Sequence, residues 1–521
     1  MTSEQTDVTT NLLDQTQNPT MLDAAAKRTS VFQEVYPILE PYVYAAIVKE
    51  HEDHKIRYEV IEPTLKPDEE KTLQEVKKIL IDEIDVNLKD IEGYERAKNY
   101  LVHKTRETIK KYRIKIAEEA IDKLAYYVVR DFLGYGKIDP IMKDHMIEDI
   151  SADGVNVPIY VWHRQYESLP TNIVFNEANE LDSFIIRLAY LAGKNISLAQ
   201  PILDATLPDG SRVQLTYGNE ITRRGSTFTI RRFKTDPLTI TDLIAFNTIN
   251  AELAAYLWYI IENRSSVLVA GGIACGKTTM LNCLSMFIRP ELKIVTVEDT
   301  QELNIAHENW IPSVARAGFK FEDQKAGTIT LFDLLKTAMR QRPDYIIVGE
   351  VRGEEAYTLF QAMATGHLGM ATLHAESVES AIRRLQSEPM NIPDALIAMT
   401  NVIMVMTRTE VNGRPARRVA SVAELEPLEN QNKNLQTEEV FRWNPNTDNF
   451  TFSGHSKLIR RSMLKMGLTE SDIAKEFASR RTVLEWMVQQ GIRRHTDVAK
   501  VIREYYANPA RVFQRARVSL K

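Results

Sequence analysis

The glycine-rich stretch at residues 271–278 contains the residue types that bind a phosphate chain. Its sequence, GGIACGKT, matches the phosphate-loop pattern G-x-x-x-x-G-K-[ST]. Gly271 and Gly276 allow the backbone to curl so that successive N–H groups point at one phosphate. Lys277 can reach the β- and γ-phosphates of a nucleotide, and the Thr278 hydroxyl can bind Mg²⁺. The stretch therefore predicts a site for a nucleoside triphosphate with Mg²⁺.

For this chemistry a strand must lead into the loop and a helix must leave it, because the helix N-terminus adds its positive end to the site. The apolar run at 266–270 predicts that strand, and residues 279–287 favour the helix. The residues expected to contact the nucleotide are Gly271, Gly272, Ile273, Ala274, Cys275, Gly276, Lys277, Thr278 and Thr279.

Cys275 inside the loop has two interpretations. It is small enough to fill the place of a serine. The alternative is a thiol activated by neighbouring N–H groups and by Lys277, whose oxidation would block nucleotide binding.

Hydrolysis of a phosphate chain also needs carboxylates near the Mg²⁺ and the attacking water. Glu298 and Glu350 each follow a short apolar run, and Asp299 and Glu302 lie just beyond the first of them. Because the carboxyl ends of parallel strands meet at the edge that holds the phosphate loop, we expect these side chains at the site. The alternative is that they are merely solvated or act as helix caps.

Basic and imidazole groups surround the same strands. Arg340, Arg342 and Arg352 bracket the Glu350 strand, and Arg316 follows the Glu298 region. His367 and His374 flank the next strand. A single histidine is usually structural, but two beside a phosphate site are candidate sensors of the γ-phosphate.

The composition narrows the class of protein. In 521 residues, 65 Lys and Arg stand against 71 Asp and Glu, a net charge of −6, whereas a protein that coats nucleic acid is normally basic. Two cysteines exclude a disulfide framework and a four-cysteine zinc site. No run of roughly 18 apolar residues predicts a membrane span, and the polar N-terminus lacks a secretory signal. We expect a soluble, intracellular protein of several domains.

The hydrophobic pattern predicts several regions in chain order. Residues 1–30 lack periodicity and favour a disordered tail. The region 31–137 is expected to hold a helix or turn at 35–43, then a strand at 56–61, then a small helical subdomain over about 68–132.

The rest of the chain predicts an α+β N-terminal lobe at 138–235, a linker or hinge at 236–240 and an α/β domain at 241–521 that ends in helices. The alternation of strands and helices after residue 238 is typical of a parallel sheet. A hairpin is expected between 402 and 425, with its turn at Asn412 and Gly413. Other strands are expected at 158–162, 213–217, 228–232, 266–270, 293–297, 345–348 and 370–374.

Three further stretches follow the phosphate loop along the chain: DTQEL from Asp299, RQRPDYIIVGEVRG from Arg340 and TGHLGMATLHA from Thr365. Together they resemble the Asp box, the atypical Walker B motif and the His box of the type II/IV secretion ATPase superfamily. ENWIPSV from Glu308 and YTLFQAMA from Tyr357 are similar to its archaeal branch, which contains the archaellum motor ATPase and the ATPases that assemble archaeal type IV pili.

This resemblance implies a RecA-like ATPase domain preceded by a PAS-like lobe, with ATP and Mg²⁺ as ligands. It implies that Glu298 and Glu302 lie near the attacking water, that Glu350 lies with Mg²⁺, and that His367 and His374 act as sensors. Arg340, at the start of the Walker B-like stretch, is a further catalytic candidate. In the family, arginines of the N-terminal lobe close over the phosphates, and Arg212 and Arg231 or Arg232 match that region here. Each of the three N-terminal arginines could instead form a surface ion pair.

The resemblance also implies partners. These are further copies in a homohexameric ring, a polytopic membrane platform protein and an accessory motor ATPase, with the chain at the cytoplasmic face of the membrane. The basic C-terminal tail could touch anionic lipid or simply be solvated. No nucleic acid is expected. The implied work is assembly or rotation of a pilus-like filament.

Two other functions stay open. A DNA-translocating ATPase of the conjugation type belongs to the same superfamily, but the acidic net charge and the lack of a basic, aromatic strip argue against it. A scaffold that binds nucleotide without turnover is the second alternative.

Overall fold

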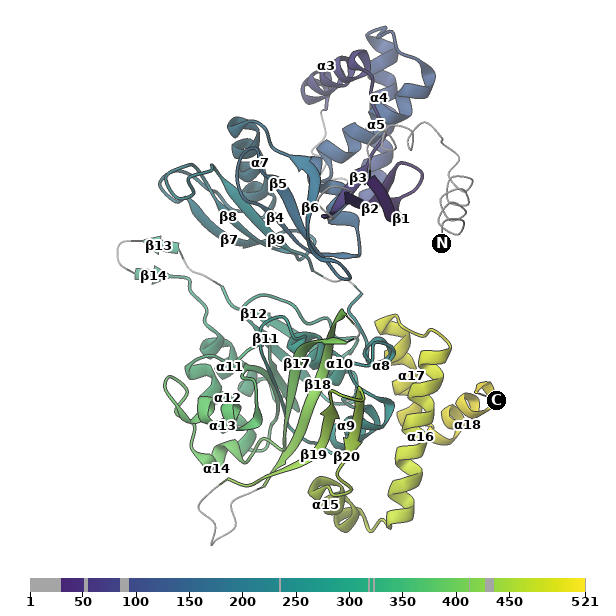
Figure 1. The fold of residues 1–521 in the computed structure, drawn as a ribbon. Coiled ribbons are helices and arrows are strands. Elements are labelled where there is room, and N and C mark those ends of the chain that lie inside the picture. Colours follow the sequence, from purple (N-terminus) through teal and green to yellow (C-terminus); the bar gives the residue numbers. More distant parts are fainter. Residues whose placement is uncertain are drawn as a thin grey trace. The chain divides into compact units, whose positions relative to one another are not determined.

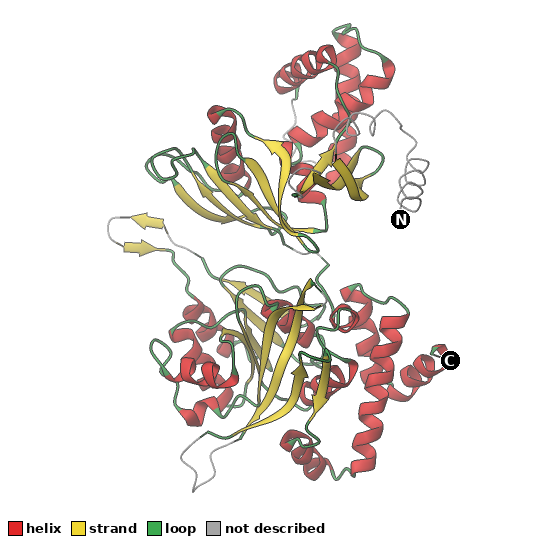
Figure 2. Ribbon diagram, in the orientation of Figure 1, coloured by secondary structure: helices red, strands yellow, loops and turns green. Residues whose placement is uncertain are grey.

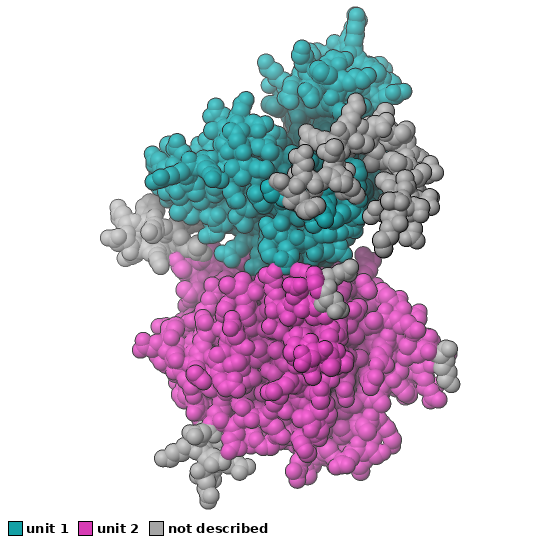
Figure 3. All heavy atoms as spheres, in the orientation of Figure 1, with its two compact units in different colours: residues 1–233 teal, residues 234–521 magenta. Residues whose placement is uncertain are grey.

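The computed structural model describes residues 30–50, 55–84, 93–233, 236–316, 319–321, 324–411, 413–426 and 435–520. The chain divides into two compact units, residues 1–233 and 234–521 (Figure 3). The expected tail at 1–30 falls outside the described residues except for Ser30. Each unit contains a β-sheet with helices packed beside it (Figures 1 and 2).

Unit 1 contains a sheet of nine strands in the order β1-β2-β3-β6-β5-β4-β9-β8-β7. Of the helix or turn expected at 35–43, the helix is wrong and the turn is present at residues 40–42, between β1 and β2 of an antiparallel hairpin. Its β-branched and aromatic side chains pack well on a sheet, and β3 pairs with the outer side of β2. The strands are β1 (Ser30–Leu39), β2 (Val43–Glu50), β3 (Ile56–Ile61), β4 (Ile147–Ala152), β5 (Pro158–His163), β6 (Glu167–Val174), β7 (Ile202–Thr206), β8 (Arg212–Thr216) and β9 (Thr227–Arg231).

A helical subdomain interrupts this sheet, as the 3.6-residue pattern predicted. It consists of α3 (Pro67–Glu83), α4 (Tyr94–Lys111) and α5 (Glu118–Phe132). One small apolar core joins the three helices: Leu73, Val76, Leu80, Ile109, Leu124 and Val128. Further helical segments among the described residues of the unit are η2 (Gly136–Ile138), α6 (Asp139–Lys143) and α7 (Ala178–Leu191).

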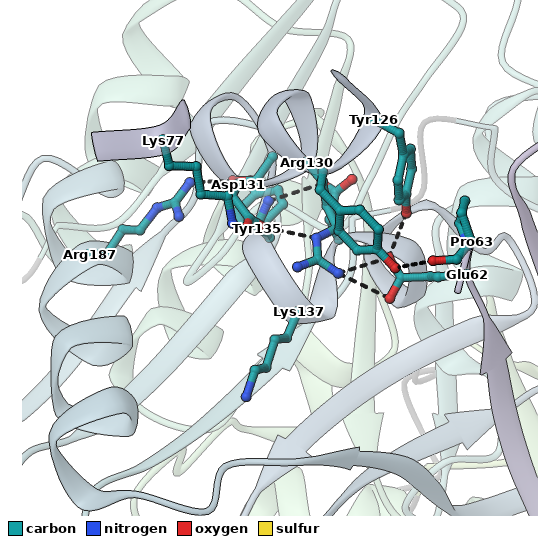
Figure 4. A network of polar contacts seen from close by, with 12 residues as sticks. Glu62, Pro63, Lys77, Tyr126, Arg130, Asp131, Tyr135, Lys137 and Arg187 are labelled. Carbon is teal, nitrogen blue, oxygen red and sulfur yellow. Dashed lines mark hydrogen bonds and ion pairs between the residues drawn. The ribbon is translucent and has the colours of Figure 1, made fainter. Parts of the chain in front are cut away.

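A polar network ties the subdomain to the sheet (Figure 4). Arg130 of α5 donates from Nη1 to both oxygens of Glu62, at 2.9 and 3.0 Å, just past the end of β3. The Arg130 Nε donates to Asp131 at 2.7 Å, and Lys77 of α3 forms an ion pair with the same carboxylate. Tyr126 donates to Glu62 at 2.6 Å. These half-buried charges are therefore mutually paired across the junction.

Unit 2 contains a second sheet in the order β12-β11-β15-β16-β10-β17-β18-β19-β20. Strands from β12 to β17 run parallel, and β17 to β20 pair antiparallel. The parallel strands expected from the sequence are all present, as is the hairpin, although Asn412 of its turn lies outside the described residues. The strands are β10 (Val267–Gly271), β11 (Ile294–Glu298), β12 (Trp310–Val314), β15 (Tyr345–Val348), β16 (Leu368–His374), β17 (Val402–Val411), β18 (Arg414–Leu425), β19 (Thr437–Asn444) and β20 (Asn449–Phe452), with a separate pair β13 (Phe319–Phe321) and β14 (Gln324–Ala326).

Helices bury both faces of this sheet, which explains why its central strands are continuously apolar. One face packs against α8 to α10 and the C-terminal helices, and the other against α11 to α14 (Figure 1). This parallel sheet with helices on both faces has the α/β class that was expected. The helices are α8 (Ile240–Ala245), α9 (Ala251–Glu262), α10 (Lys277–Ser285), α11 (Leu331–Arg340), α12 (Glu354–Ala364), α13 (Val378–Gln386), α14 (Asp394–Ile397), α15 (Lys457–Met466), α16 (Glu470–Gln489), α17 (His495–Ala507) and α18 (Pro509–Ser519).

The segment 236–240, expected to be a linker, is bound to unit 2. Asp236 Oδ1 accepts a hydrogen bond from the backbone N–H of His495 at 3.2 Å, and the His495 ring Nδ1 lies 2.9 Å from the same oxygen. Thr239 donates to the Arg493 carbonyl at 3.1 Å. Ile240 already begins α8. The hinge itself stays a prediction, and residues 236–240, for which it was expected, are held by contacts within unit 2.

Within the described part of the chain, no helix has both the length and the apolar character that crossing a lipid bilayer requires.

Candidate active site

The phosphate loop stands between β10 and α10, as the sequence predicted. Gly276, the residue before α10, has φ 91°, and Ala274 has φ 57°. A Cβ atom on Gly271 would lie 2.4 Å from the sulfur of Cys275 and 2.7 Å from a backbone oxygen, so only glycine fits there. Lys277 Nζ donates to the Gly272 carbonyl at 2.6 Å. The lysine is thus held at the loop it is expected to serve.

Cys275 points into the protein and is 1% exposed. Its thiol donates to the Gly272 carbonyl at 3.2 Å, and burial raises its pKa. A reactive cysteine needs the opposite, a lowered pKa and exposure. The structure therefore supports the filler role and contradicts the activated thiol.

Glu298 ends β11 and is 2% exposed. Its Oε1 accepts backbone hydrogen bonds from Glu302 at 2.9 Å and Leu303 at 3.0 Å, whereas Oε2 is buried without a hydrogen-bond partner among the described residues. Burial raises the pKa of this carboxyl to about 7. Glu298 therefore fixes the loop that carries Asp299 and Glu302, and it keeps one oxygen available.

Glu350 follows β15, the neighbour of β11, so both carboxylates lie at one edge of the sheet. Arg352 joins Glu350 to the loop after β11: its Nε lies 3.1 Å from Glu350 Oε2, and its Nη2 lies 3.1 Å from Asp299 Oδ2. Among the described residues no group of three or more His, Cys, Asp or Glu could hold a metal by itself. The hard oxygens of Thr278 and Glu350 nevertheless suit Mg²⁺, which typically uses few protein ligands together with substrate phosphates.

The two predicted histidines lie at opposite ends of β16. His374 ends the strand in register with Gly271, beside the phosphate loop. His367 precedes the first residue of the strand, with its Nδ1 3.3 Å from the Ala362 carbonyl. They are seven residues apart along the strand, which at about 3.3 Å per residue is roughly 23 Å. The two histidines flank β16, as expected, but only His374 stands at the edge of the sheet that holds the phosphate loop of the same chain. A sensor role for His367 stays a prediction that this placement does not support.

Arg340 is separated from the phosphate loop in the same way. It ends α11, whose chain leads through Gln341 into the start of β15, and the Gln341 carbonyl accepts from Lys293 at the start of β11 at 2.7 Å. Arg340 therefore lies at the amino edge of the sheet, and not at the edge that holds Glu350.

The arginines predicted from the N-terminal lobe belong to unit 1, and their approach to phosphate stays a prediction. Arg232 is already engaged within that unit, since its Nη1 donates to the Ile147 carbonyl at 3.1 Å and to the Asp144 carbonyl. Arg212 is half exposed, 4.0 Å from Asp204, and its strand position is opposite Arg231. Arg232 is therefore the weakest of the three candidates.

Two residues near the loop were missed from the sequence. Arg417 of β18 donates from Nε to the Ala274 carbonyl at 3.0 Å. Asn282 of α10 is buried, and its Oδ1 accepts from the backbone of Asn304 at 3.0 Å, in the loop that Glu298 also holds. Nothing local in the sequence marks either residue, because strand register and loop path bring them there.

Residues 135–504 match the family model described as "Type II/IV secretion system protein". The chain belongs to this family. The resemblance inferred from the motifs is thereby confirmed.

Named relatives of this secretion-family chain lie in archaea and bacteria. "Uncharacterized protein MJ0900" of Methanocaldococcus jannaschii is 35% identical over 494 residues, covering 91% of this chain and 88% of its own, in line with the archaeal branch. "Putative conjugal transfer protein Rv3659c" of Mycobacterium tuberculosis is 30% identical over 318 residues, 57% of this chain and 86% of its own. The Legionella pneumophila ATPase DotB is a structural neighbour with 16% identity and a TM-score of 0.39, covering 71% of this chain and 91% of that one.

Proposed function

We propose that this chain is an ATPase that converts ATP hydrolysis into the assembly or rotation of a pilus-like filament. The observation that carries the ATPase activity is the phosphate loop with Lys277, which follows β10, in a sheet whose strand β11 ends at a buried carboxylate, Glu298. The pKa of Glu298 is raised to about 7, and its Oε2 has no partner among the described residues. A general base works best when its pKa lies near the operating pH.

The residues divide the chemistry between them. When ATP binds, its phosphates replace the Gly272 carbonyl as the partner of the Lys277 ammonium group. The loop N–H groups and the N-terminus of α10 bind the negative charge of the phosphates. Glu302, on the loop held by Glu298, orients water with it. Mg²⁺, held by Thr278 and Glu350, would neutralise charge that develops on the phosphates. His374 stands beside Gly271 as the phosphate sensor.

The mechanical role is proposed from family membership. Closure of unit 1 over ATP, with Arg212 or Arg231 reaching the phosphates, and reopening after hydrolysis would supply the stroke. In this proposal the chain works as a homohexamer at the cytoplasmic face of the membrane, on a polytopic platform protein and with an accessory motor ATPase. The described basic residues near the C-terminus lie in the helix α18 and not in a tail, so anionic lipid would be contacted there, with a merely solvated helix as the alternative, and nucleic acid has no place.

DNA transfer is the second candidate, favoured by the relative named as a conjugal transfer protein. The filament motor and DNA transfer are distinguished by the ATPase rate of the purified chain, measured with single-stranded DNA, with platform protein in vesicles and with empty vesicles. Stimulation by the platform protein alone supports the filament motor. Stimulation by DNA replaces that proposal with DNA transfer.

A scaffold without turnover predicts a different result. Glu350→Gln should abolish hydrolysis while ATP still binds, because the change removes a charge at the Mg²⁺ and leaves the phosphate loop intact. Equally slow hydrolysis by wild type and variant would favour the scaffold.

A further inference from the structure

The hairpin of β17 and β18 extends beyond the strand that leads into the phosphate loop. Gly271, the last residue of β10, is in register with Met406, and β17 continues to Val411. At about 3.3 Å per residue this extension is roughly 17 Å long. In its return strand Arg417 pairs in register with Arg408, beyond the end of β10.

Arg417 contacts the loop with both its stem and its head. The Nε donates to the Ala274 carbonyl at 3.0 Å, and a Cβ atom built on Gly276 would lie 3.4 Å from the Arg417 Cδ. The adjacent Arg418 points to the other face, where it is buried and bonded to Asp448 at 2.7 and 2.8 Å. Only one of the two neighbouring arginines therefore reaches the phosphate loop.

We propose that Arg417 is a positioning residue that clamps the phosphate loop in its phosphate-binding shape. The carbonyl of Ala274 and the N–H of Cys275 belong to one planar trans peptide, so they point in opposite directions. Holding the carbonyl on the hairpin side turns that N–H away from the hairpin. Ala274 also has φ 57°, a left-handed conformation that a residue with a side chain adopts only when its surroundings enforce it.

The contact acts on the loop alone and adds little to the stability of the unit. Arg417 is exposed, and across the described ranges its side chain has no hydrogen bond beyond the one to Ala274 and no ion pair. Removing it leaves no buried charge without a partner. Arg418 is itself buried and donates to Asp448 and to the Phe246 carbonyl, so its removal would disturb the packing of the unit, and it is unsuitable as a control. Arg442 on β19 is the matched control, because it is an exposed arginine of the same sheet whose ion pair is with Glu439, three residues away on its own strand.

Two buried cysteines provide a test that does not depend on activity. Cys275 lies in the loop, next to Ala274, and Cys283 is fully buried in α10. N-ethylmaleimide labelling of the full chain without nucleotide, followed by mass spectrometry of the two cysteine peptides, measures how often each site opens. Arg417→Met should speed labelling of Cys275 about five- to tenfold and leave Cys283 unchanged. Arg417→Lys should restore most of the protection, and Arg442→Met should match wild type.

Two labelling results would overturn the clamp. One is an unchanged rate at Cys275 in Arg417→Met. The other is an equal acceleration at both cysteines, since this means that the substitution loosens the whole unit and not the loop.

The effect on nucleotide rests on the proposed function. Arg417→Met should raise the Kd for ATP and the KM about five- to tenfold and change kcat less than about twofold, because the loop must be reordered when phosphate binds. A loss of kcat with an unchanged KM would contradict a positioning role. Failure of the wild type to bind ATP would refute the proposed function. The labelling experiment would still test whether Arg417 holds the loop.

Discussion

Glu298 combines a structural and a chemical role in one side chain. One oxygen holds the backbone of Glu302 and Leu303, and the other is buried without a partner among the described residues. Burial disfavours the charged form, so the pKa rises to about 7 and both protonation states are populated at neutral pH. The residue therefore has the proton affinity of a general base at some expense to folding stability.

Glu298→Gln tests this balance. The folded pKa of about 7 exceeds the usual 4.5, so the contribution of Glu298 to stability is complete below pH 4.5 and is lost as the pH rises through 7. Glutamine keeps the acceptor but does not titrate. When the pH is raised from 5 to 8, the free energy of unfolding of the variant should increase relative to that of the wild type by up to about 3 kcal/mol. The variant should also lose hydrolysis. Urea unfolding followed by tryptophan fluorescence at both pH values measures this, and an unchanged difference would contradict the raised pKa.

Lys277→Ala tests the phosphate loop itself. The Lys277 Nζ is bonded to the Gly272 carbonyl at 2.6 Å, a contact within the loop, so removal of the side chain should leave folding intact. The loss of a charge-assisted contact to phosphate should weaken ATP binding about 10- to 100-fold and abolish measurable turnover. Titration with a fluorescent ATP analogue and a phosphate-release assay provide the two readouts. Wild-type hydrolysis by the variant would refute the site.

At the scale of elements, the junction between helical subdomain and sheet depends on paired charges. Arg130 binds Glu62 and Asp131, and Lys77 binds Asp131 from a second helix (Figure 4). Although burial opposes it, Arg130 and Lys77 lower the pKa of Asp131. Since the apolar core of α3 to α5 is small, these contacts should decide how firmly the subdomain is attached.

Arg130→Met should therefore loosen the subdomain. It leaves Asp131 and Glu62 with less compensation in a half-buried place, which should cost about 3 kcal/mol. Arg106→Met is the control, because the Arg106–Asp122 pair is 53% and 51% exposed and should contribute less than about 1 kcal/mol. Hydrogen exchange of α3 to α5 should rise in the first variant and not in the second. Equal protection in both would show that the network is dispensable.

At the scale of the whole molecule, the candidate groups are divided between the two units. The phosphate loop and its carboxylates belong to unit 2, whereas Arg212 and Arg231 belong to unit 1. If ATP binding needs only unit 2 and hydrolysis needs both, affinity and turnover should respond to different substitutions. This separation is what a motor driven by closure of two lobes requires.

Arg212→Ala in the full chain should lower kcat about 10- to 100-fold and change the Kd for ATP less than about threefold. Arg223→Ala, another exposed residue of unit 1, is the control and should leave both unchanged. Single-turnover hydrolysis and equilibrium ATP titration measure the two quantities. An unaltered kcat in Arg212→Ala would remove this residue from the proposed closed state.

The sequence by itself determined the strand–loop–helix at 266–287, the two carboxylates after apolar strands and the family, because each depends on contiguous residues with a local requirement. Glycine at 271 and 276, lysine at 277 and an acid at a strand end are such local signals. The apolar stripes that predicted the helices α3 to α5 could likewise be recognised from the sequence. The segment 35–43 could not, since hairpin pairing between β1 and β2 overrode its local pattern.

Only the tertiary structure decided which of the candidates meet. Strand direction places His374 beside the phosphate loop and leaves His367 and Arg340 at the other edge of the sheet. Sheet register brings Arg417 into contact with Ala274, although the two residues are 143 positions apart in the sequence. Burial gives Glu298 a pKa near 7, a property that depends on everything packed around it. Spacing along the chain contains none of this, because distances between edges, faces and buried groups exist only after the sheet has formed.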